Sequence, residues 1–311
     1  MNILITGGNG YLGGNLARYL RTKYNVLIGT SNSQVIKKKN ILYSWDDYRS
    51  LLVATKKIDL IIHASGVGSK ECENNPHLAY KINVEGTELL VNAAIENRVK
   101  KIIYLSSAHV YDNPLAGIIN EKTLVRNDHP YAKTKFMAEN ILKKKDNEKK
   151  IQSVILRLSN VIGSPISKKS NCWQLVAHDL VLQAMRNENL YINNNPNIER
   201  DFLSMTSFIK IIDEIINFDH KKNKDSKVYN IGSGVTKKII DLAELIKDRS
   251  LVLYKKNLPV SFDKEKNTST KKFIYDVSKS KKIIPIKKII LNESLTEDID
   301  SLLVFCQRSV K

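Results

Sequence analysis

Short apolar runs alternate with amphipathic stretches along the first half of the chain. Each run is rich in Ile, Leu and Val, which is typical of a parallel strand covered on both faces. These runs predict strands at residues 2–6, 25–29, 60–63, 101–105 and 153–158. The stretches between them predict helices at residues 12–23, 48–56, 76–97 and 131–145. The alternation predicts an α/β fold with a doubly wound parallel sheet.

This alternation stops after about residue 163. Further on, the pattern predicts helices at residues 174–187, 208–218, 241–247 and 295–305, and strands at 228–231 and 251–254. We therefore expect a first domain over residues 1–163, joined by a returning strand near 228–231. Residues 164–311 would form a smaller, mainly substrate-binding region that is interleaved with the first domain.

A glycine-rich turn follows the first predicted strand directly. Residues 6–14 read TGGNGYLGG and lead into the first predicted helix. Gly8, Gly10 and Gly13 fit G-x-G-x-x-G, and Gly7, Gly10 and Gly13 fit the wider G-x-x-G-x-x-G. Such glycines permit a tight turn and close approach of the backbone to a pyrophosphate at a helix N-terminus. The turn predicts dinucleotide binding on a Rossmann-type sheet.

The end of the second predicted strand bears on which dinucleotide is bound. An acidic residue there would bind the ribose 2′-hydroxyl of NAD, but residues 29–33 read GTSNS. Hydroxyl and amide groups, with lysines at 37–39 nearby, suit a 2′-phosphate better. We therefore expect Thr30, Ser31 and Asn32 to favour NADP over NAD. The alternative is that NAD binds without that hydrogen bond.

Three side chains further along the chain carry acid–base chemistry. Tyr131 and Lys135 form a Y-x-x-x-K pair whose spacing places both on one face of a predicted helix. An ammonium beside a phenol favours the phenolate, so we expect the pKa of Tyr131 to fall below its usual value of about 10. Ser107 follows the strand at 101–105, at the end where parallel sheets bind ligands. It could hydrogen-bond a reacting oxygen.

With these motifs in order, the sequence resembles the extended short-chain dehydrogenase/reductase family, in its NAD-dependent sugar epimerase/dehydratase group. Five further stretches carry the resemblance, at residues 63–66 (HASG), 83–87 (NVEGT), 156–160 (LRLSN), 200–202 (RDF) and 229–232 (YNIG). The resemblance covers nearly the whole chain. It implies an NAD(P)-dependent enzyme that acts on a nucleotide-sugar substrate.

The resemblance also implies roles for individual residues. Tyr131 would be the catalytic acid/base, Lys135 would hold the nicotinamide ribose and tune Tyr131, and Ser107 would orient the substrate. Asn160 and Arg200 would meet the nucleotide part of the substrate, although Arg200 could equally be a surface arginine. Residues along the cofactor would be Gly7, Gly10, Tyr11, Leu12, Gly13, Ala64, Ser65 and Asn83.

Departures from the family pattern limit which of the family's reactions we expect this chain to catalyse. The 4,6-dehydratases carry an Asp-Glu pair just after the active-site Ser or Thr, where this chain has Ala108 and His109. Dehydration is therefore disfavoured. His109 resembles the position at which GDP-fucose synthases carry a reactive cysteine, and it could act as a second acid/base. We favour the alternative of a histidine that packs at the strand end. The family's later phosphate-binding arginine has no clear counterpart here, and Lys264 or Lys266 is the candidate to replace it as a point charge.

These observations favour an oxidoreductase that reduces a 4-keto-6-deoxysugar nucleotide with hydride from NADPH. One alternative is an NAD-dependent nucleotide-sugar 4-epimerase, and a second is a non-enzymatic NAD(P)-sensing protein. Polysaccharide biosynthesis is the natural setting for either enzyme. The family commonly dimerises through two long helices, so the resemblance also implies a homodimer built on residues 76–97 and 131–145.

Composition excludes several other classes. The net charge is +18, but the lysines are dispersed and no aromatic residues are interleaved with them, so we expect no nucleic-acid partner. The three cysteines form no C-x-x-C pair, which predicts neither a metal site nor a disulfide framework and fits a reducing compartment. No basic leader and no bilayer-length apolar run are seen. We therefore expect a cytoplasmic protein without membrane insertion.

Overall fold

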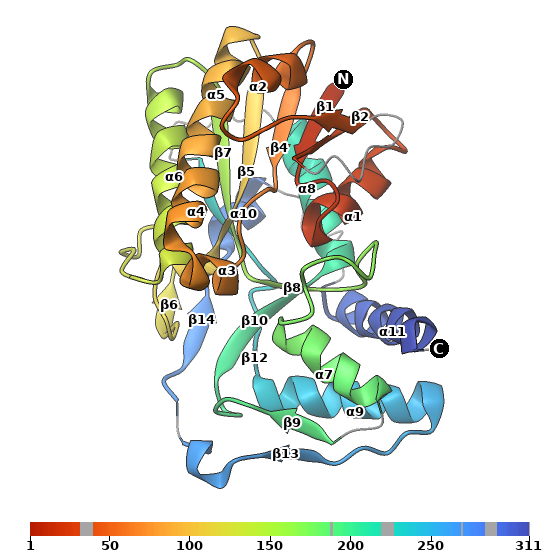
Figure 1. Ribbon diagram of the computed structural model, residues 1–311. Coiled ribbons are helices and arrows are strands. Elements are labelled where there is room, and N and C mark those ends of the chain that lie inside the picture. Colours follow the sequence, from red (N-terminus) through yellow and green to blue (C-terminus); the bar gives the residue numbers. More distant parts are fainter. Residues whose placement is uncertain (32–39, 187–188, 219–226, 269, 284–290, 311) are drawn as a thin grey trace. The chain divides into compact units, whose positions relative to one another are not determined.

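A computed structural model of the chain describes residues 1–31, 40–186, 189–218, 227–268, 270–283 and 291–310 (Figure 1). The chain divides into two compact units. The first comprises Met1–Pro114, Glu121–Leu158 and Asp219–Tyr229. The second comprises Leu115–Asn120, Ser159–Phe218 and Asn230–Lys311.

Within the described residues, the largest sheet has seven strands. Their spatial order is β11 (Val228–Ile231), β7 (Gln152–Leu158), β5 (Lys101–Ser107), β4 (Leu60–His63), β1 (Asn2–Thr6), β2 (Asn25–Thr30) and β3 (Asn40–Leu42). All neighbours from β7 to β3 are parallel. The chain winds from β1 to one edge and then from β4 toward the other, so the strand order reverses between β1 and β4. This confirms the doubly wound parallel sheet.

Helices cover both faces of this sheet. One face packs against α2 (Tyr48–Thr55), α5 (Gly86–Glu96) and α6 (Pro130–Asn147) through a buried apolar cluster. Helix α1 (Tyr11–Leu20) contacts β1 and β2 and lies on the other side of the sheet from α5 and α6 (Figure 1). Parallel strands buried on both sides explain why the predicted runs are apolar at almost every position.

The single helix predicted over residues 76–97 is interrupted. The structure has α4 (Pro76–Tyr80), then a π-helical turn, η2 (Lys81–Glu85), and then α5. Asn75 caps α4 by accepting a hydrogen bond from the Leu78 N–H at 3.0 Å. Pi-helical turns are rare and are frequent at functional sites, and this one carries Asn83. A short helix, α3 (Ser69–Asn74), precedes α4.

One predicted strand is wrong. Residues 251–254 belong to α9 (Ile239–Tyr254) and not to a strand. The helix buries Leu242, Ala243 and Ile246 at helical spacing, while Leu251, Val252 and Leu253 are exposed. Four consecutive apolar residues do not distinguish a strand from the end of a helix, and here the preceding helical face decides.

The second unit has a three-stranded sheet in the order β12 (Thr236–Lys238), β10 (Glu199–Ser204) and β8 (Asn160–Ile162). Its apolar core is built mainly from α7 (Val176–Met185), α9 and α11 (Leu291–Val310), together with residues of β8 and β10. Two short sheets pair β13 (Val260–Phe262) with β9 (Leu190–Ile192), and β14 (Phe273–Tyr275) with β6 (Gly117–Ile119). The remaining elements are α8 (Met205–Asn217), η5 (Lys264–Lys266) and α10 (Ser278–Ile283).

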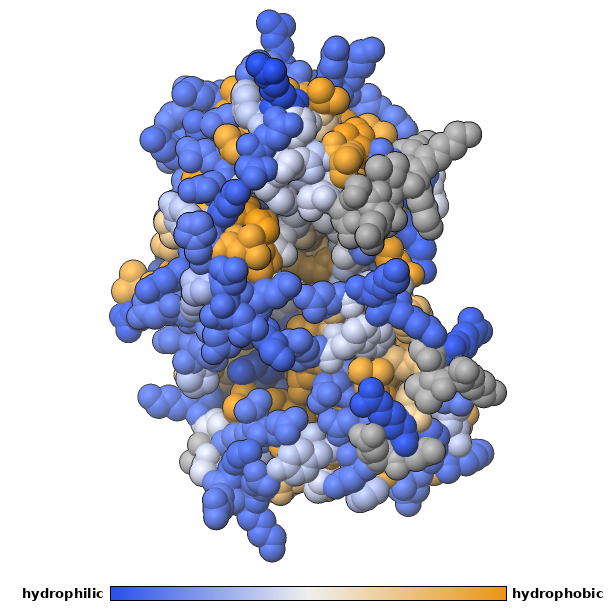
Figure 2. Space-filling model, viewed as in Figure 1, coloured by the Kyte–Doolittle hydropathy of each residue, from blue (hydrophilic) through white to orange (hydrophobic). Residues whose placement is uncertain are grey.

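The surface agrees with the dispersed charge of the sequence. On the face drawn in Figure 2, hydrophilic residues predominate and hydrophobic ones form small, separate patches. In the described part of the chain, no helix has the length and apolar character that a membrane span requires. The same residues contain no group of His, Cys, Asp and Glu that could hold a metal ion.

Candidate active site

The glycine turn joins β1 to α1 in a conformation that strongly favours glycine. Gly7 has a φ of +66°, a left-handed conformation that other residues rarely adopt. The Gly10 N–H donates to the Gly7 carbonyl at 2.8 Å. A Cβ at Gly13 would lie 2.4 Å from the Gly7 carbonyl oxygen. The turn is therefore as tight as the sequence predicted.

The first turn of α1 opens directly from the glycines. Gly10 is its N-cap and uses no side chain to satisfy the first backbone N–H groups. The first turn, which includes Tyr11 and Leu12, contains no acidic residue. Free N–H groups and the positive end of the helix dipole suit a phosphate. These residues therefore fit the pyrophosphate of a dinucleotide.

The segment after β4 packs against this turn. A Cβ on Gly7 would lie 2.9 Å from the Cα of Ser65 and 3.0 Å from the carbonyl carbon of Ala64. On its other side, a Cβ on Gly66 would lie 3.1 Å from the Lys135 ammonium. Residues 64–66 therefore connect the glycine turn with Lys135, at the point where the strand order reverses. Parallel sheets bind ligands at this point.

A buried histidine, His63, connects these segments; the sequence placed it in the HASG stretch but gave its side chain no role. His63 Nδ1 lies 2.7 Å from Thr6 Oγ1, and His63 Nε2 lies 2.9 Å from Thr87 Oγ1. Thr87 donates its own hydrogen to the Asn83 carbonyl at 2.6 Å, so it must accept from His63 Nε2. Burial, followed by the charge of Lys135, lowers the pKa of His63 to about 3. His63 is thus neutral and carries its proton on Nε2.

Ser107 and Tyr131 meet at the end of β5. Ser107 is the last residue of the strand, and its hydroxyl accepts a hydrogen bond from the His109 N–H at 3.2 Å. Its side chain also hydrogen-bonds the side chain of Tyr131. Helix α6 begins at Pro130, and His129 caps it by accepting from the Tyr131 N–H at 3.1 Å. This cap fixes Tyr131 in the first turn of the helix.

The pKa of Tyr131 is shifted in the opposite direction from the one expected from the sequence. Burial raises the pKa of Tyr131 above 10, and the hydrogen bond with Ser107 opposes that rise without reversing it. The expected lowering by Lys135 is therefore wrong for the protein alone, because removing the phenolate from water costs more than the nearby polar groups return. Tyr131 holds its proton at neutral pH.

Lys135 is a buried cation beside this pair. Only 6% of the residue is exposed, and its ammonium donates to the Leu105 carbonyl at 3.2 Å. The ammonium also lies 5.0 Å from the centre of the Tyr104 ring and 6.0 Å from that of Tyr131. Burial lowers the pKa of Lys135 to about 8. The bond to the Leu105 carbonyl is the one hydrogen bond that Lys135 forms among the described residues, so two of its three ammonium hydrogens are available to a ligand.

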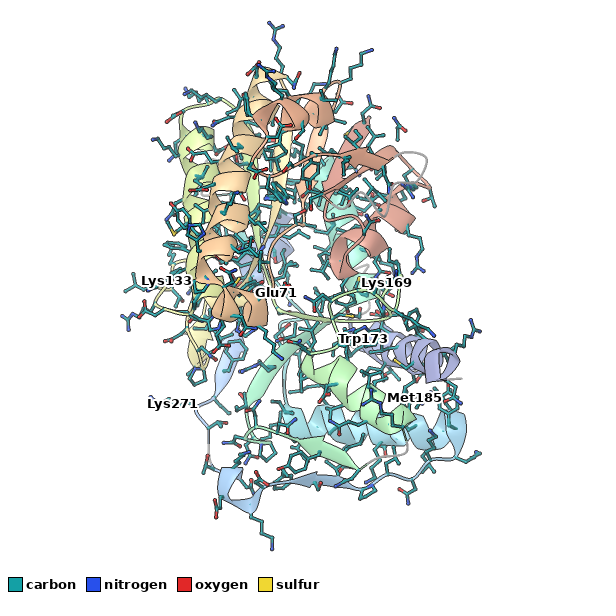
Figure 3. The ribbon with its side chains drawn as sticks, in the orientation of Figure 1. Glu71, Lys133, Lys169, Trp173, Met185 and Lys271 are labelled. Atoms are coloured by element: carbon teal, nitrogen blue, oxygen red, sulfur yellow. The ribbon has the colours of Figure 1, made fainter. Side chains whose placement is uncertain are left out.

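A second lysine on α6 shows what an ordinary surface position looks like. Lys133 points outward from the helix (Figure 3), where it pairs with Asp128 at 2.9 Å. Its side chain is 57% exposed. A solvated surface lysine and a buried one are only two positions apart, so the burial of Lys135 follows from its face of the helix and not from local composition.

Asn83 supports this site through its amide. Its Oδ1 accepts from the Val67 N–H at 2.8 Å, and its Nδ2 donates to Thr134 Oγ1 at 3.1 Å. The π-helical turn therefore fixes the loop after β4 and the first turns of α6. Cys72, which is buried, lies within 3.7 Å of the same Nδ2. The side chain of Asn83 thus has protein partners at both ends of its amide.

The residues expected to select the cofactor are described only in part. Thr30 ends β2 and is buried, and Ser31 follows it and is exposed. Asn32 lies outside the described residues, as do Ser33 and the lysines at 37–39. The preference for NADP therefore stays a prediction.

The structure places Ala108 and His109 in η3 (Ala108–Val110), directly after Ser107. Ala108 is buried and His109 is half-buried. The His109 carbonyl accepts a hydrogen bond from Asn127 Nδ2 at 2.7 Å. The backbone of His109 thus fixes the end of β5, and whether its ring meets a substrate stays a prediction.

Asn160 and Arg200 lie on adjacent strands of the second unit. Asn160 is opposite Phe202 in the β8–β10 register and donates to the Asp201 carbonyl at 3.1 Å. Arg200 donates to the Glu199 carbonyl at 3.2 Å and forms no ion pair with any described residue. Burial lowers the pKa of Arg200. A half-buried guanidinium without a carboxylate partner suits an anionic ligand.

The two lysines considered as phosphate contacts lie in η5 of the same unit. Lys266 pairs with Asp263 at 2.8 Å and donates to the Asn193 carbonyl at 3.0 Å. Lys264 is in the same short turn. Their expected role as a replacement for the missing arginine stays a prediction.

Comparison with known families decides what kind of protein this is. The model of the NAD dependent epimerase/dehydratase family matches residues 3–232. The chain belongs to this family. The family match extends from the first strand of the large sheet to the end of β11, and so includes Ser107, Tyr131 and Lys135.

Two curated relatives illustrate the reactions found in the family. The chain is 28% identical to human dTDP-D-glucose 4,6-dehydratase, over 79% of this chain and 73% of that protein. It is 26% identical to UDP-glucose 4-epimerase of Mycoplasma genitalium, over 79% of this chain and 80% of that protein. The protein is thus similar to a dehydratase and to an epimerase at nearly equal identity.

Solved structures share the fold over almost the whole chain. UDP-glucose 4-epimerase of Thermotoga maritima, solved with UDP-glucose, covers 100% of both chains with a TM-score of 0.81 at 21% identity. The RMD protein of Pseudomonas aeruginosa, solved with NADPH, covers 99% of both chains with a TM-score of 0.79 at 20% identity. Family, relatives and fold agree on an NAD(P)-dependent enzyme of nucleotide-sugar chemistry.

Proposed function

We propose that this family member reduces a 4-keto-6-deoxysugar nucleotide with NADPH. The observation that carries the proposal is the assembly of Ser107, Tyr131 and Lys135 with a protonated Tyr131. A reductase needs a proton donor at the start of its reaction, and burial raises the pKa of Tyr131 so that it holds its proton. Reduced nicotinamide carries no positive charge that would oppose this effect.

Each residue has a distinct task in such a reaction. The cofactor, held by the glycine turn and Lys135, would supply hydride to the carbonyl carbon. Tyr131 donates its proton to the carbonyl oxygen, so the C=O group becomes CH–OH and a tyrosinate remains. Ser107 hydrogen-bonds the same oxygen, and the Lys135 ammonium stabilises the tyrosinate until it regains a proton from water.

The proposed preference for NADPH rests on the end of β2. Thr30 and Ser31 offer hydroxyl groups where an acidic residue would bind the ribose of NAD. Titration of the purified protein with NADPH and NADH, followed by cofactor fluorescence, tests this directly. We expect tighter binding of NADPH, and tighter binding of NADH would overturn the preference.

The nucleotide part of the substrate is proposed to bind the second unit, where residues 164–311 mainly lie. Arg200 supplies a half-buried positive charge without an ion-pair partner among the described residues, and Asn160 lies on the neighbouring strand. The net charge of +18 also attracts a diphosphate at long range. Replacement Arg200→Met should raise KM for the nucleotide sugar with less effect on kcat.

A panel of 4-keto-6-deoxysugar nucleotides with different bases tests the reductase proposal. Loss of NADPH absorbance on adding one of them, with formation of the deoxysugar nucleotide, is the expected result. The control is the same panel with Tyr131→Phe protein. If the wild-type protein consumes no NADPH with any member of the panel, the reductase proposal fails.

A 4-epimerase is the second candidate, favoured by the similarity to the Mycoplasma genitalium epimerase. An epimerase would retain its cofactor through purification and interconvert two sugar nucleotides without added reductant. Release of NAD on denaturing the purified protein, together with such interconversion, would identify it. Dehydration is not proposed despite the human relative, because Ala108 and His109 offer no carboxylate after Ser107.

We also propose a homodimer built on the helices of the first unit. Leu78 and Tyr80 on α4 and Met137 on α6 are large apolar side chains with 41%, 41% and 39% of their surface exposed. Exposed apolar residues on neighbouring helices favour burial against a second copy. Sedimentation of wild-type and Met137→Glu protein tests this: we expect a dimer for the first and dissociation for the second.

A further inference from the structure

Glu139 is a carboxylate buried completely inside the first unit. None of its surface is exposed. It follows Lys135 on α6 by one helical turn and Tyr131 by two, so all three lie along one face of the helix. Burying a carboxylate is costly unless it is paired and hydrogen-bonded. Its position next to the proposed site therefore calls for a physical explanation.

The partners of Glu139 come from α6 itself and from the two strands that α6 packs against. Arg157 on β7 donates from Nε to Oε1 at 2.9 Å and from a terminal nitrogen to Oε2 at 2.6 Å. Ser106 on β5 donates to Oε1 at 2.7 Å. Lys143, one turn further along α6, donates to Oε2 at 3.1 Å. Glu139 therefore fastens α6 to both strands.

These contacts fix the elements that carry the reacting groups. Ser106 is the residue before Ser107 on β5, and Glu139 lies on the helix that begins with Tyr131. The hydrogen bond from Ser106 to Glu139 therefore sets how far the end of β5 lies from α6. The separation between the hydroxyl groups of Ser107 and Tyr131 depends on that distance, because Ser107 lies on β5 and Tyr131 on α6.

Glu139 also acts on Lys135 through its charge. Burial lowers the pKa of Lys135, while the Cys72 thiol and the Glu139 carboxylate oppose that shift. Glu139 is charged at neutral pH: burial, the largest effect, raises the pKa of this carboxyl, but Arg157, Lys143 and Ser106 together outweigh burial and keep that pKa below its usual value. The titratable or charged groups around the two residues are Tyr104 on β5, His63 on β4, Cys72 on α3, Tyr131 and Lys143 on α6, Tyr111, and Arg157 on β7.

We propose that Glu139 is a positioning residue: through Ser106 it sets the spacing between Ser107 and Tyr131, and its carboxylate, one turn of α6 from Lys135, favours the ammonium form of that lysine. The first half of this proposal rests on the proposed function. The second half concerns cofactor binding only, and it can be tested whichever reaction the enzyme catalyses.

The charge is tested with Glu139→Gln, which keeps the shape and removes the charge. NADPH affinity is measured across the pH range by fluorescence titration. NADPH affinity should fall at high pH, and we call this part of the pH profile the alkaline limb. We expect the alkaline limb to begin roughly half to one pH unit lower in the variant than in wild type. Glu139→Asp, which keeps the charge, should restore the wild-type position. An unchanged alkaline limb in a folded Glu139→Gln protein overturns this half of the proposal.

The spacing is tested with Ser106→Ala, which removes one hydrogen bond and no charge. We expect kcat to fall by about tenfold with little change in KM and no shift of the alkaline limb. A change in kcat below about twofold overturns the positioning half. This variant still tests the spacing if Glu139→Gln leaves Arg157 unpaired and fails to fold. If wild type reduces no keto sugar, the proposed function fails, and the cofactor titrations still test the charge.

A matched control is available on the same helix. Asp146 is a carboxylate held by Lys227 at 2.8 Å and by the Ser153 N–H at 3.0 Å, and it lies two turns beyond Glu139. Asp146→Asn makes the same change of carboxylate to amide. We expect it to lower thermal stability without moving kcat or the alkaline limb. A limb shift equal to that of Glu139→Gln would mean that any loss of charge on α6 suffices, and the specific role of Glu139 would be rejected.

Discussion

At the scale of single residues, burial decides the protonation of the proposed site. Tyr131 and Lys135 are both shifted toward their neutral forms, Tyr131 by a raised pKa and Lys135 by a pKa lowered to about 8. Both shifts have the same first cause, the removal of a charged form from water. The site is therefore set to hold a proton on the phenol and to lose the ammonium charge in mildly alkaline solution.

Tyr131→Phe removes the proposed proton donor and leaves the ring. We expect kcat to fall by roughly 10²–10⁴-fold, because the substrate oxygen would have no positioned acid, while cofactor affinity stays close to wild type. Steady-state kinetics and NADPH titration measure the two effects. Tyr254→Phe, at the last residue of α9 in the second unit, is the control. Survival of full activity in Tyr131→Phe would show that the acid/base is another residue.

The pH dependence of cofactor binding follows from Lys135. Its pKa in the folded protein is about 8, so the ammonium is lost as the pH rises through that value. We expect NADPH affinity to fall above pH 8, since the ribose loses a charged donor. Lys135→Met should bind more weakly and show no such fall. A wild-type affinity that is flat between pH 7 and 9 would contradict this assignment.

At the scale of elements, the turn between β1 and α1 illustrates how local geometry requires particular residues. A Cβ at Gly13 would lie 2.4 Å from the Gly7 carbonyl oxygen, whereas one at Gly10 would lie 3.1 Å from it. Backbone atoms in a tight turn cannot yield as a flexible side chain can. The first turn of α1 must therefore shift if Gly13 carries a side chain.

Gly13→Ala should lower the free energy of unfolding by about 1–3 kcal/mol and weaken NADPH binding, because the turn must open to admit the methyl group. Gly10→Ala should have a smaller effect on both. Urea unfolding and cofactor titration provide the measurements. Equal losses in the two variants would show that the 2.4 Å contact is not the cause.

At the scale of the whole molecule, two buried histidines link stability to pH. His63 in the first unit has its pKa lowered to about 3 by burial, and His178 in the second has its pKa lowered to about 4 by burial. An unfolded chain binds protons on both rings below about pH 6.5, while the folded chain does not until lower pH. The unfolded state therefore binds more protons, and stability falls as the pH drops.

This linkage predicts how steeply acid weakens the fold. Each histidine should remove about 1.4 kcal/mol of unfolding free energy per pH unit below its unfolded pKa. His178→Gln keeps a donor for the Gly163 carbonyl, which His178 Nε2 meets at 3.1 Å, and removes the titration. Urea unfolding between pH 6.5 and 4.5 should show a shallower slope in the variant. Parallel slopes would mean that His178 is already charged when folded.

The sequence by itself determined the features that depend on local spacing. Short, nearly continuous apolar runs gave the bounds of β1 and β4, and the glycine spacing identified the turn that follows β1, because a tight turn has few possible sequences. The i, i+4 spacing placed Tyr131 and Lys135 on one face of α6. The short strands of the second unit, such as β8 and β12, were missed because three residues carry no period.

Tertiary structure alone decided the features that depend on distant residues. The raised pKa of Tyr131 opposed the expectation, since the sequence shows a neighbouring lysine but not the loss of water. The pairing of Glu139 with Arg157 and Ser106, and of His63 with Thr6 and Thr87, joins segments separated by 18 to 57 positions. Desolvation and long-range hydrogen bonds exist only after folding brings such segments together, so no local pattern encodes them.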